Sequence, residues 1–435
     1  MTYDSLYGFR HRAHKYLGRA RDATFELVDA VLTSRHLSSF VELSQSPLFR
    51  RKWPSAYEAL QDSRPQRQRL MRLYLEQLPS DGPIVLAGDH TGWPRPEAKR
   101  LRERTHEHQA NGGGSLGPVS LGQGYSTLAW VPEAEGSWAL PLRHERITSW
   151  ESPISLAAFQ LRQVCQSLPH RPLSLWDSEY GCASFVLKTA DIKADKLMRL
   201  RSNRNLWGAP PPYSGRGRPR VHGDCFKPND PATWPEPNQD LTVVDPKLGA
   251  VRVRAWHQMH FRQAAPHPMT LIQVQRLGED GQPRSIRPLW LVWVGDTMPD
   301  LEHLWQRYLR RFALEHWYRF LKQRLHWMVP KLGEPKAAER WSDLMPLATW
   351  QLWLARDLVQ DAPLPWQKKL PILTPGRVAD SIASLLARLG SPAQAPKPRG
   401  KSPGWPKGQN RNRKPRYPTV RKRPSRPKKT SQTVA

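Results

Sequence analysis

The sequence predicts a mixed α/β fold, because strand-like and helix-like segments alternate along its middle part. Two short apolar runs, at 84–89 and 171–177, each end on an aspartate. Apolar runs of this length that are bounded by turn residues are typical of buried strands. A helix-like segment at 152–168 precedes the second run, so the order strand, strand, strand, helix, strand indicates a mixed sheet with acidic residues at one edge.

The first 80 residues predict a helical N-terminal domain. They lack strand-like alternation, and Leu70, Leu73, Leu75 and Leu78 follow a helical spacing. The domain is expected to end at the turn formed by Ser80, Asp, Gly and Pro83.

Residues 81–204 are predicted to form the first part of the mixed α/β core. Besides the two runs that end on aspartate, strand-like segments occur at about 117–130 and 137–143. The helix at 152–168 begins with Ser152 and Pro153, residue types that favour the N-cap and the first turn.

Residues 205–287 predict a loop followed by a small β-rich insertion. The stretch from 205 to about 240 is rich in Pro, Gly, Asn and Arg, which is typical of a linker. Alternating runs then predict strands at 241–244, 250–256, 269–275 and 288–294. The last of these would be a core strand that opens the segment 288–390.

The segment 288–390 also predicts a long helix from about Asp300 to Trp327, followed by further helices. Residues 391–435 carry fourteen Lys or Arg, no acid and many prolines. Such a composition cannot bury an apolar core, so we expect a disordered basic tail.

The charge balance indicates a polyanionic partner. The chain has 67 Lys and Arg against 38 Asp and Glu, a formal net charge of +29, which is the usual mark of a protein that binds nucleic acid. Three cysteines without a CxxC pair favour neither a disulfide framework nor a zinc ribbon, and they indicate a reducing cytoplasm. No apolar run reaches the roughly 18 residues of a membrane span, so no membrane partner is expected.

One face of the long helix gathers polar side chains. At about 100° per residue, Tyr308, Arg311, Glu315 and Lys322 fall within roughly 60° of one another, opposite an apolar face. Glu315 could simply form surface ion pairs with Arg311 and Arg319 at four-residue spacing, each worth only about a few tenths of a kcal/mol. The helix alone leaves both interpretations open.

The two strand-end aspartates favour a metal site. Asp89 and Asp177 on neighbouring strands, with Glu315 from the helix, would supply the oxygen ligands that suit two Mg²⁺ or Mn²⁺ ions in phosphodiester hydrolysis. Glu179 is a rival third ligand, because residues two apart on a strand share a face. We predict DNA contacts from the surrounding side chains, with the cations on phosphates and the phenol ring on a displaced base: Tyr308, Arg311, Arg319 and Lys322.

A second candidate for DNA binding lies in the Pro/Gly-rich loop. Arg216, Gly, Arg218 and Pro219 resemble the core of an AT-hook, an extended arm that lies in the minor groove. A plain linker is the alternative. The histidine pairs His106/His108 and His257/His260 lack nearby cysteines, so we interpret them as structural or exposed rather than as zinc ligands.

The order of Asp89, Asp177, a β-rich insertion, Tyr308, Arg311, Glu315 and Lys322 resembles that of a DDE transposase of bacterial insertion sequences. More narrowly, the spacing Tyr, two residues, Arg, three residues, Glu, six residues, Lys is the signature of the IS-four-like branch, and this sequence matches it at every position. The resemblance covers roughly residues 80–330.

The resemblance implies a ribonuclease-H-like (retroviral-integrase-like) catalytic core with a β-rich insertion. It also implies cut-and-paste DNA transposition with two Mg²⁺ (or Mn²⁺) ions per active site, held by Asp89, Asp177 and Glu315. Double-stranded DNA, namely the inverted repeats at the ends of the element and the target, would be the partner. A homodimer in the DNA complex and a place at the bacterial nucleoid are expected on the same ground. Two other hypotheses stay open: a catalytically silent DNA-binding protein and a structure-specific nuclease.

Overall fold

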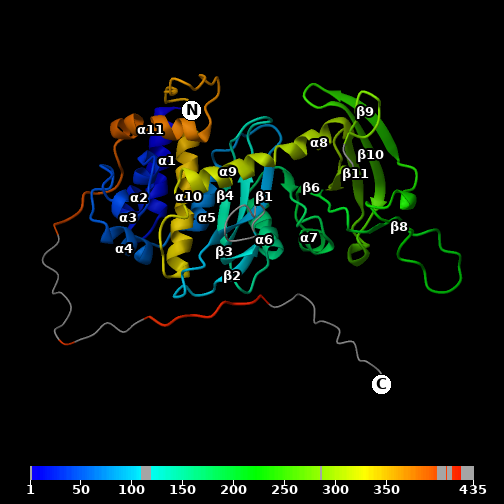
Figure 1. Ribbon diagram of the computed structural model, residues 1–435, viewed down its shortest axis with the longest axis horizontal. Helices are drawn as coiled ribbons and strands as arrows, with labels where there is room; N and C mark the ends of the chain where they lie inside the picture. Colours follow the sequence, from blue (N-terminus) through cyan, green and yellow to red (C-terminus); the bar gives the residue numbers. More distant parts are fainter. Residues whose placement is uncertain (1, 109–118, 285–286, 399–407, 409–413, 423–435) are drawn as a thin grey trace.

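The computed structural model describes residues 2–108, 119–284, 287–398, 408 and 414–422. A large mixed sheet lies at the centre, with helices at one end and on its faces (Figure 1). Its ten strands follow the order β2-β3-β1-β5-β6-β12-β11-β10-β9, and β4 pairs with β3. The strands are β1 (Val85–Pro94), β2 (Thr105–His108), β3 (Val119–Trp130), β4 (Leu140–Ile147), β5 (Leu173–Trp176), β6 (Asp195–Arg199), β9 (Gln239–Asp245), β10 (Gly249–Met259), β11 (Met269–Arg276) and β12 (Leu289–Val294).

The helices fall into three groups along the chain. The N-terminal group is α1 (Tyr3–Tyr16), α2 (Arg21–Thr33), α3 (Phe40–Leu43), α4 (Pro54–Asp62) and α5 (Arg67–Leu75). Two helices, α6 (Pro153–Cys165) and α7 (Ala183–Lys188), lie between the strands of the core. The C-terminal group is α8 (Leu301–Leu309), α9 (Phe312–Gln323), α10 (Pro335–Ala355) and α11 (Pro375–Leu389). Within the described ranges, none of these helices has the length and apolar character needed to cross a membrane.

Strand β1 sets the geometry of the sheet. It pairs antiparallel with β3 on one side and parallel with β5 on the other, and β5 pairs parallel with β6. Gly88 is the register partner of Trp176, and a Cβ at Gly88 would lie 2.0 Å from the Trp176 ring. Glycine is therefore needed there for the indole to cross β1. Because the two strands run parallel and in register, the next residues, Asp89 and Asp177, lie side by side. This mixed sheet is compatible with a ribonuclease-H-like nuclease fold.

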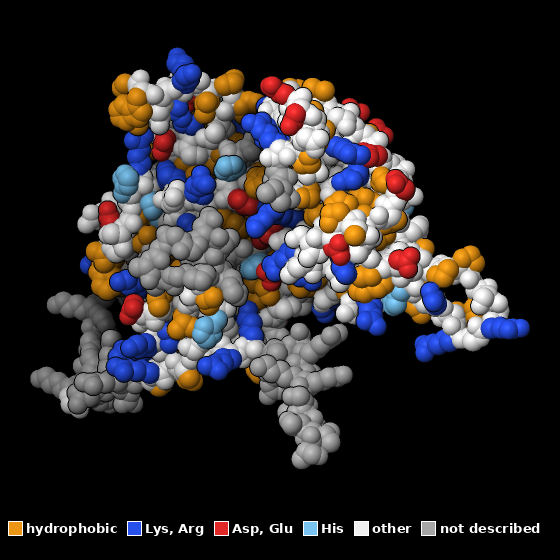
Figure 2. Space-filling model, turned by 45° about the vertical axis from the view of Figure 1, so that its right-hand side comes forward, with side chains coloured by type: hydrophobic (Ala, Val, Ile, Leu, Met, Phe, Trp, Pro, Cys, Tyr) orange, Lys and Arg blue, Asp and Glu red, His pale blue; other side chains and the backbone are white. Residues whose placement is uncertain are grey.

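The strands predicted for the insertion extend the central sheet. Strand β12 pairs antiparallel with β6, and β11, β10 and β9 follow outward from it. The chain between β6 and β9 forms a short hairpin, β7 (Leu206–Trp207) with β8 (Cys225–Phe226), and a loop between them. This loop projects from the body of the molecule (Figure 1), and Figure 2 shows Lys and Arg side chains at its tip.

The N-terminal helices share one continuous hydrophobic core with α10 and α11. Helix α1 packs on α10, and α2 packs on both α10 and α11. The buried Arg10 joins these elements: its guanidinium donates to the Asp29 carboxylate at 2.8 and 2.9 Å and to the Gly390 carbonyl at 3.1 Å. The first and last helices are therefore neighbours although they are far apart in sequence.

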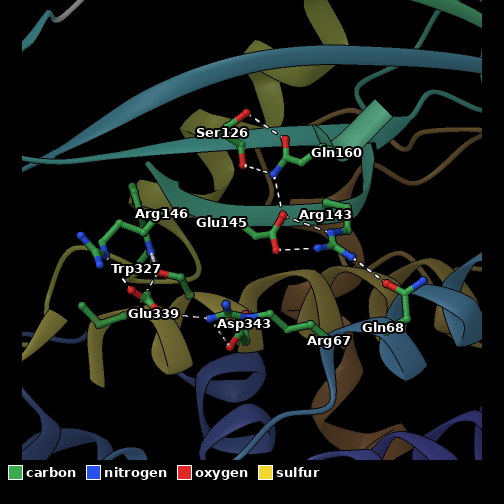
Figure 3. Close-up of polar contacts among 12 residues, drawn as sticks. Arg67, Gln68, Ser126, Arg143, Glu145, Arg146, Gln160, Trp327, Glu339 and Asp343 are labelled. Atoms are coloured by element: carbon green, nitrogen blue, oxygen red, sulfur yellow. Dashed lines mark hydrogen bonds and ion pairs between the residues drawn. The ribbon is translucent and has the colours of Figure 1, made fainter. Parts of the chain in front are cut away.

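A polar network connects the N-terminal helices to the sheet (Figure 3). Glu145 on β4 accepts hydrogen bonds from Arg143 at 2.7 and 3.0 Å and from Gln160 of α6 at 3.0 Å. Arg143 also donates to Gln68 of α5 at 3.1 Å. Such buried polar groups are stable only when they are paired, so the network holds α5 in one orientation against β4. Further ion pairs on α10 are Arg67 with Asp343 and Arg146 with Glu339.

Two sequence predictions need correction. The helix predicted from Asp300 to Trp327 is divided into α8 and α9. At the division, the backbone N–H groups of residues 310, 311, 313 and 314 each donate to the carbonyl three residues earlier, as in a 3₁₀ turn. The basic tail was predicted to be disordered throughout, but residues 414–422 pack along the segment that leads into β2. Tyr417 and Val420 donate backbone hydrogen bonds to Lys99 and Arg104, each at 2.9 Å.

Candidate active site

The two predicted aspartates meet beside the centre of the sheet. Asp89 lies within β1, and Asp177 directly follows the end of β5. Both side chains are partly buried, with 17% and 33% of their surface exposed. The Oδ1 atom of Asp89 accepts the backbone N–H of His90 at 2.7 Å, while the Oδ1 atom of Asp177 is buried without a hydrogen-bond partner among the described residues. One carboxylate oxygen of the pair is thus left unsatisfied.

Arg311 brings the third acid to the same place. Its guanidinium lies 3.1 Å from Asp89, 3.9 Å from Asp177 and 2.5 Å from Glu315. Glu315, in the first turn of α9, is half exposed, whereas Arg311 is almost completely buried. Figure 2 shows acidic and basic side chains side by side in the hollow at the middle of the face. The structure therefore gathers Asp89, Asp177 and Glu315 around a single cation.

The surroundings shift the proton affinity of these groups. Burial raises the pKa of Asp89, and the neighbouring charges of His90 and Arg311 oppose that rise. Burial alone would lower the pKa of Arg311, but the acidic groups around it outweigh burial and raise it. Arg311 is therefore charged at any physiological pH, and it neutralises part of the negative charge of the site.

Tyr308 does not lie where the sequence placed it. Because the helix is divided before α9, Tyr308 belongs to α8 and is only 2% exposed, with its hydroxyl unpaired among the described residues. Burial raises its pKa to about 12. The Arg311 guanidinium lies 5.8 Å from the ring centroid. In this conformation Tyr308 supports Arg311 by a cation–π contact and presents no ring to a DNA base.

The cations farther along α9 differ from one another. Lys322 donates to the hydroxyl of Thr91 on β1 at 2.7 Å, and burial lowers its pKa. Arg319 is exposed and forms no ion pair with Glu315 in the described part of the chain. The alternative of a surface pair between Glu315 and Arg319 is therefore not what the structure shows, while the pair with Arg311 is present. Arg319 remains available to a ligand.

His90 was given no role from the sequence, yet it connects two acids of the site. Its ring lies 3.8 Å from Asp89 and 3.7 Å from Glu179, and it hydrogen-bonds the Tyr180 hydroxyl at 3.2 Å. Glu179, the rival third ligand, thus faces His90 and has no contact with Arg311. The only signal in the sequence was the position of His90 directly after Asp89.

The remaining candidates lie away from this cluster. Arg216 and Arg218 are exposed in the projecting loop, next to Gly215 and Gly217 with positive φ. His260 is buried and bonds His222 at 2.9 Å, whereas His257 contacts Thr270. His257 and His260 therefore do not act as a pair. His106 is exposed on β2.

Three carboxylates, one of them with a free oxygen, have the chemistry of a Mg²⁺ or Mn²⁺ site. Nevertheless, no three His, Cys, Asp or Glu side chains of the described residues converge closely enough to hold a metal ion. The reason is visible at Asp89, Asp177 and Glu315, which are joined through the guanidinium of Arg311. The three carboxylates are suitable ligands for a divalent ion. The positive charge of Arg311 lies between them and disfavours the binding of a cation there.

We expect Arg311→Gln to bind Mn²⁺ more tightly than the wild-type protein, by at least about tenfold. A unit charge at 4 Å is worth about 4 kcal/mol at an effective dielectric constant near 20, so removing the competing cation should favour the ion even after partial screening. Calorimetric titration of Mn²⁺ in the absence of DNA measures the change. Arg311→Lys keeps the charge and should stay near the wild-type affinity, whereas equal or weaker binding by Arg311→Gln would contradict the competition.

Comparison with known proteins identifies the family of the chain. The profile of the DDE superfamily endonucleases matches residues 13–264, which include Asp89 and Asp177 and stop before Arg311 and Glu315. A search of curated proteins gave no match. DDE superfamily endonucleases generally use divalent metals and act on DNA. With more than half of its length matched, the chain belongs to the DDE superfamily endonucleases.

Proposed function

We propose that this DDE endonuclease is the transposase of an insertion sequence, of the IS-four-like branch. It would cut at the terminal inverted repeats of its element and join the freed 3′ ends to target DNA. The observation that carries the proposal is the meeting of Asp89, Asp177 and Glu315 around Arg311. The third acid comes from outside the matched family region, at the position that the Tyr, Arg, Glu, Lys spacing requires.

The side chains around the site would divide the work of binding and cleavage. Asp89, Asp177 and Glu315 would hold the divalent ions, which when bound activate a water or a 3′ hydroxyl and stabilise the leaving oxygen. Arg319 is exposed on the same helix as Glu315 and would contact a phosphate of the DNA strand. Lys322, which donates a hydrogen bond to Thr91, would contact the same strand.

Arg311 would change partner when DNA and metal arrive. In the structure its charge is satisfied by three carboxylates, and only 3% of its surface is exposed. When the three carboxylates hold metal instead, its guanidinium would bind a phosphate of the DNA in the bidentate manner that arginine favours. Tyr308 stays beneath it and limits its orientation.

The test compares DNA substrates with the purified wild-type protein. We expect Mg²⁺-dependent cleavage of duplexes that carry the inverted repeats flanking the gene, and no cleavage of the same duplexes in EDTA. Preference for branched DNA over these ends would instead support the structure-specific nuclease. Binding of the ends without any strand cleavage, in Mg²⁺ or in Mn²⁺, would support the catalytically silent protein and contradict the proposal.

A further inference from the structure

The C-terminal segment Lys414–Lys422 is bound along the residues that lead into β2, and its last residue reaches Glu107 of that strand. Besides the backbone bonds of Tyr417 and Val420, the Arg102 guanidinium lies 4.9 Å from the Tyr417 ring centroid. Ion pairs anchor both ends: Lys414 with Glu334 at 3.2 Å and Lys422 with Glu107 at 3.7 Å. Figure 1 shows this segment in red, running below β2.

The docked segment forms part of the wall of a cavity of about 600 Å³. The other walls are residues 94–101, which follow β1, and residues 328–333, which follow α9. Five cations line the cavity against one carboxylate, Glu97: they are Arg95, Lys99, Arg100, Lys331 and Arg416. In the described part of the chain, none of the five forms an ion pair with an acid. The cavity therefore carries a large unbalanced positive charge.

In the wall of the cavity, the Arg95 guanidinium has one N–H group without a hydrogen-bond acceptor. The guanidinium lies over Trp93 at 5.2 Å, and Nη2 donates to the Leu332 carbonyl at 2.8 Å. Its Nη1 atom is buried and has no hydrogen-bond partner among the described residues. A buried donor without a partner is costly, and an anionic ligand in the cavity would supply the missing acceptor.

The adjoining cavity, of about 670 Å³, has a smaller excess of positive charge, although it shares Leu332 and Gly333. There Arg146 pairs with Glu103 and Glu339, and Lys414 pairs with Glu334. Its five cations face three carboxylates, against one carboxylate in the first cavity. The larger excess of cations therefore lies on the side of the C-terminal segment that carries Arg416.

We propose that the docked segment Lys414–Lys422 completes a cationic groove that binds the phosphate backbone of duplex DNA next to the active site. Pro94, in the wall of the groove, lies five residues beyond Asp89 on β1. At roughly 3.4 Å per residue this is about 17 Å, or about five base pairs of duplex. One DNA molecule can therefore reach both places. The inference rests on the proposed function, since it names the surface that holds the substrate.

The charge of the groove is tested by DNA binding in EDTA, where no cleavage occurs. We expect the triple variant Lys99→Gln, Arg100→Gln, Lys331→Gln to bind a short duplex of arbitrary sequence more weakly. The slope of log affinity against log salt concentration should fall by up to about 2.7, from roughly 0.9 for each lost phosphate contact. The matched control Lys368→Gln, Lys369→Gln, Arg388→Gln removes three exposed charges from α11 and the segment before it, and it should leave the slope unchanged. Figure 1 shows α11 at the upper left, away from β2.

The docking of the segment is tested without a change of charge. The variant Tyr417→Ala, Val420→Pro removes the contact with Arg102 and the hydrogen bond to Arg104, while every cation of the segment is kept. We expect it to lose DNA affinity nearly as much as a protein truncated after Arg413. Truncation after Lys422 removes four cations (Arg423, Arg426, Lys428 and Lys429) and leaves the groove complete, so the salt slope should drop less.

Wild-type affinity in both the triple variant and the undocked variant would overturn the groove. Wild-type affinity in the undocked variant alone would show that the tail acts only as a charged arm, and it would also overturn the proposal. These results do not depend on cleavage. A protein that never cuts DNA but whose binding follows the predicted pattern would refute the transposase and retain the groove.

Discussion

Asp89→Asn and Glu315→Gln are expected to reduce cleavage at the element ends by at least about a thousandfold each. Each variant removes one anionic ligand while it keeps the size of the side chain, so the charge that holds the divalent ions falls. Metal stabilisation of the transition state is worth several kcal/mol, and about 4 kcal/mol corresponds to three powers of ten in rate. Excision of a donor element with Mg²⁺ as the cofactor is the measurement.

The matched control is Glu302→Gln on α8, which is an exposed acid outside the cluster. It should excise at the wild-type rate. DNA binding in EDTA should persist in all three variants, because the cations of the surface are unchanged. If Asp89→Asn and Glu315→Gln excised as fast as the wild type, the catalytic role of the cluster would be refuted.

Arg10→Ala is expected to lower the free energy of unfolding by about 3–5 kcal/mol, the usual cost of leaving one charge of a buried pair without its partner. Arg10 and Asp29 are each only 2% exposed. The substitution leaves the Asp29 carboxylate buried and removes the bond to Gly390. Urea unfolding followed by tryptophan fluorescence measures the loss.

Two comparisons make this stability prediction specific. Arg12→Ala breaks an ion pair with Glu76 in which both side chains are 47% exposed, and such pairs contribute at most about 1 kcal/mol. The double variant Arg10→Leu, Asp29→Leu removes both charges and should be far less destabilised than Arg10→Ala. A loss in Arg10→Ala no larger than that in Arg12→Ala would contradict the role of the buried pair.

The sequence was informative where local pattern and tertiary structure agree. The apolar runs that end on Asp89 and Asp177 correspond to β1 and β5, and the helix that begins after Ser152 is α6, with the capping box that its first residues form. Because parallel strands present equivalent ends at one edge of a sheet, the proximity of the two aspartates could be expected from the chain alone.

Elements that depend on distant partners were not predictable in the same way. Strand β6 reads Asp, Lys, Leu, Met, Arg, which is short and charged and becomes a strand only between β5 and β12. No proline or glycine marks the division between α8 and α9, so the sequence predicts one continuous helix. The burial of Tyr308 was not predicted for the same reason. The docking of Tyr417 and Val420 uses backbone N–H groups, which every residue except proline possesses, so it leaves no sequence signal.

The packing of the first helices against α10 and α11 has a consequence during synthesis. The Arg10 side chain contacts Gln351, which is 341 residues later in the sequence. Arg10 can therefore reach its final surroundings only after Gln351 has been synthesised. A ribosome that adds about 5–20 residues per second needs on the order of 20–70 seconds for that distance. During that interval α1 and α2 lack the helices that cover them, so the nascent chain exposes their apolar faces until α10 and α11 emerge.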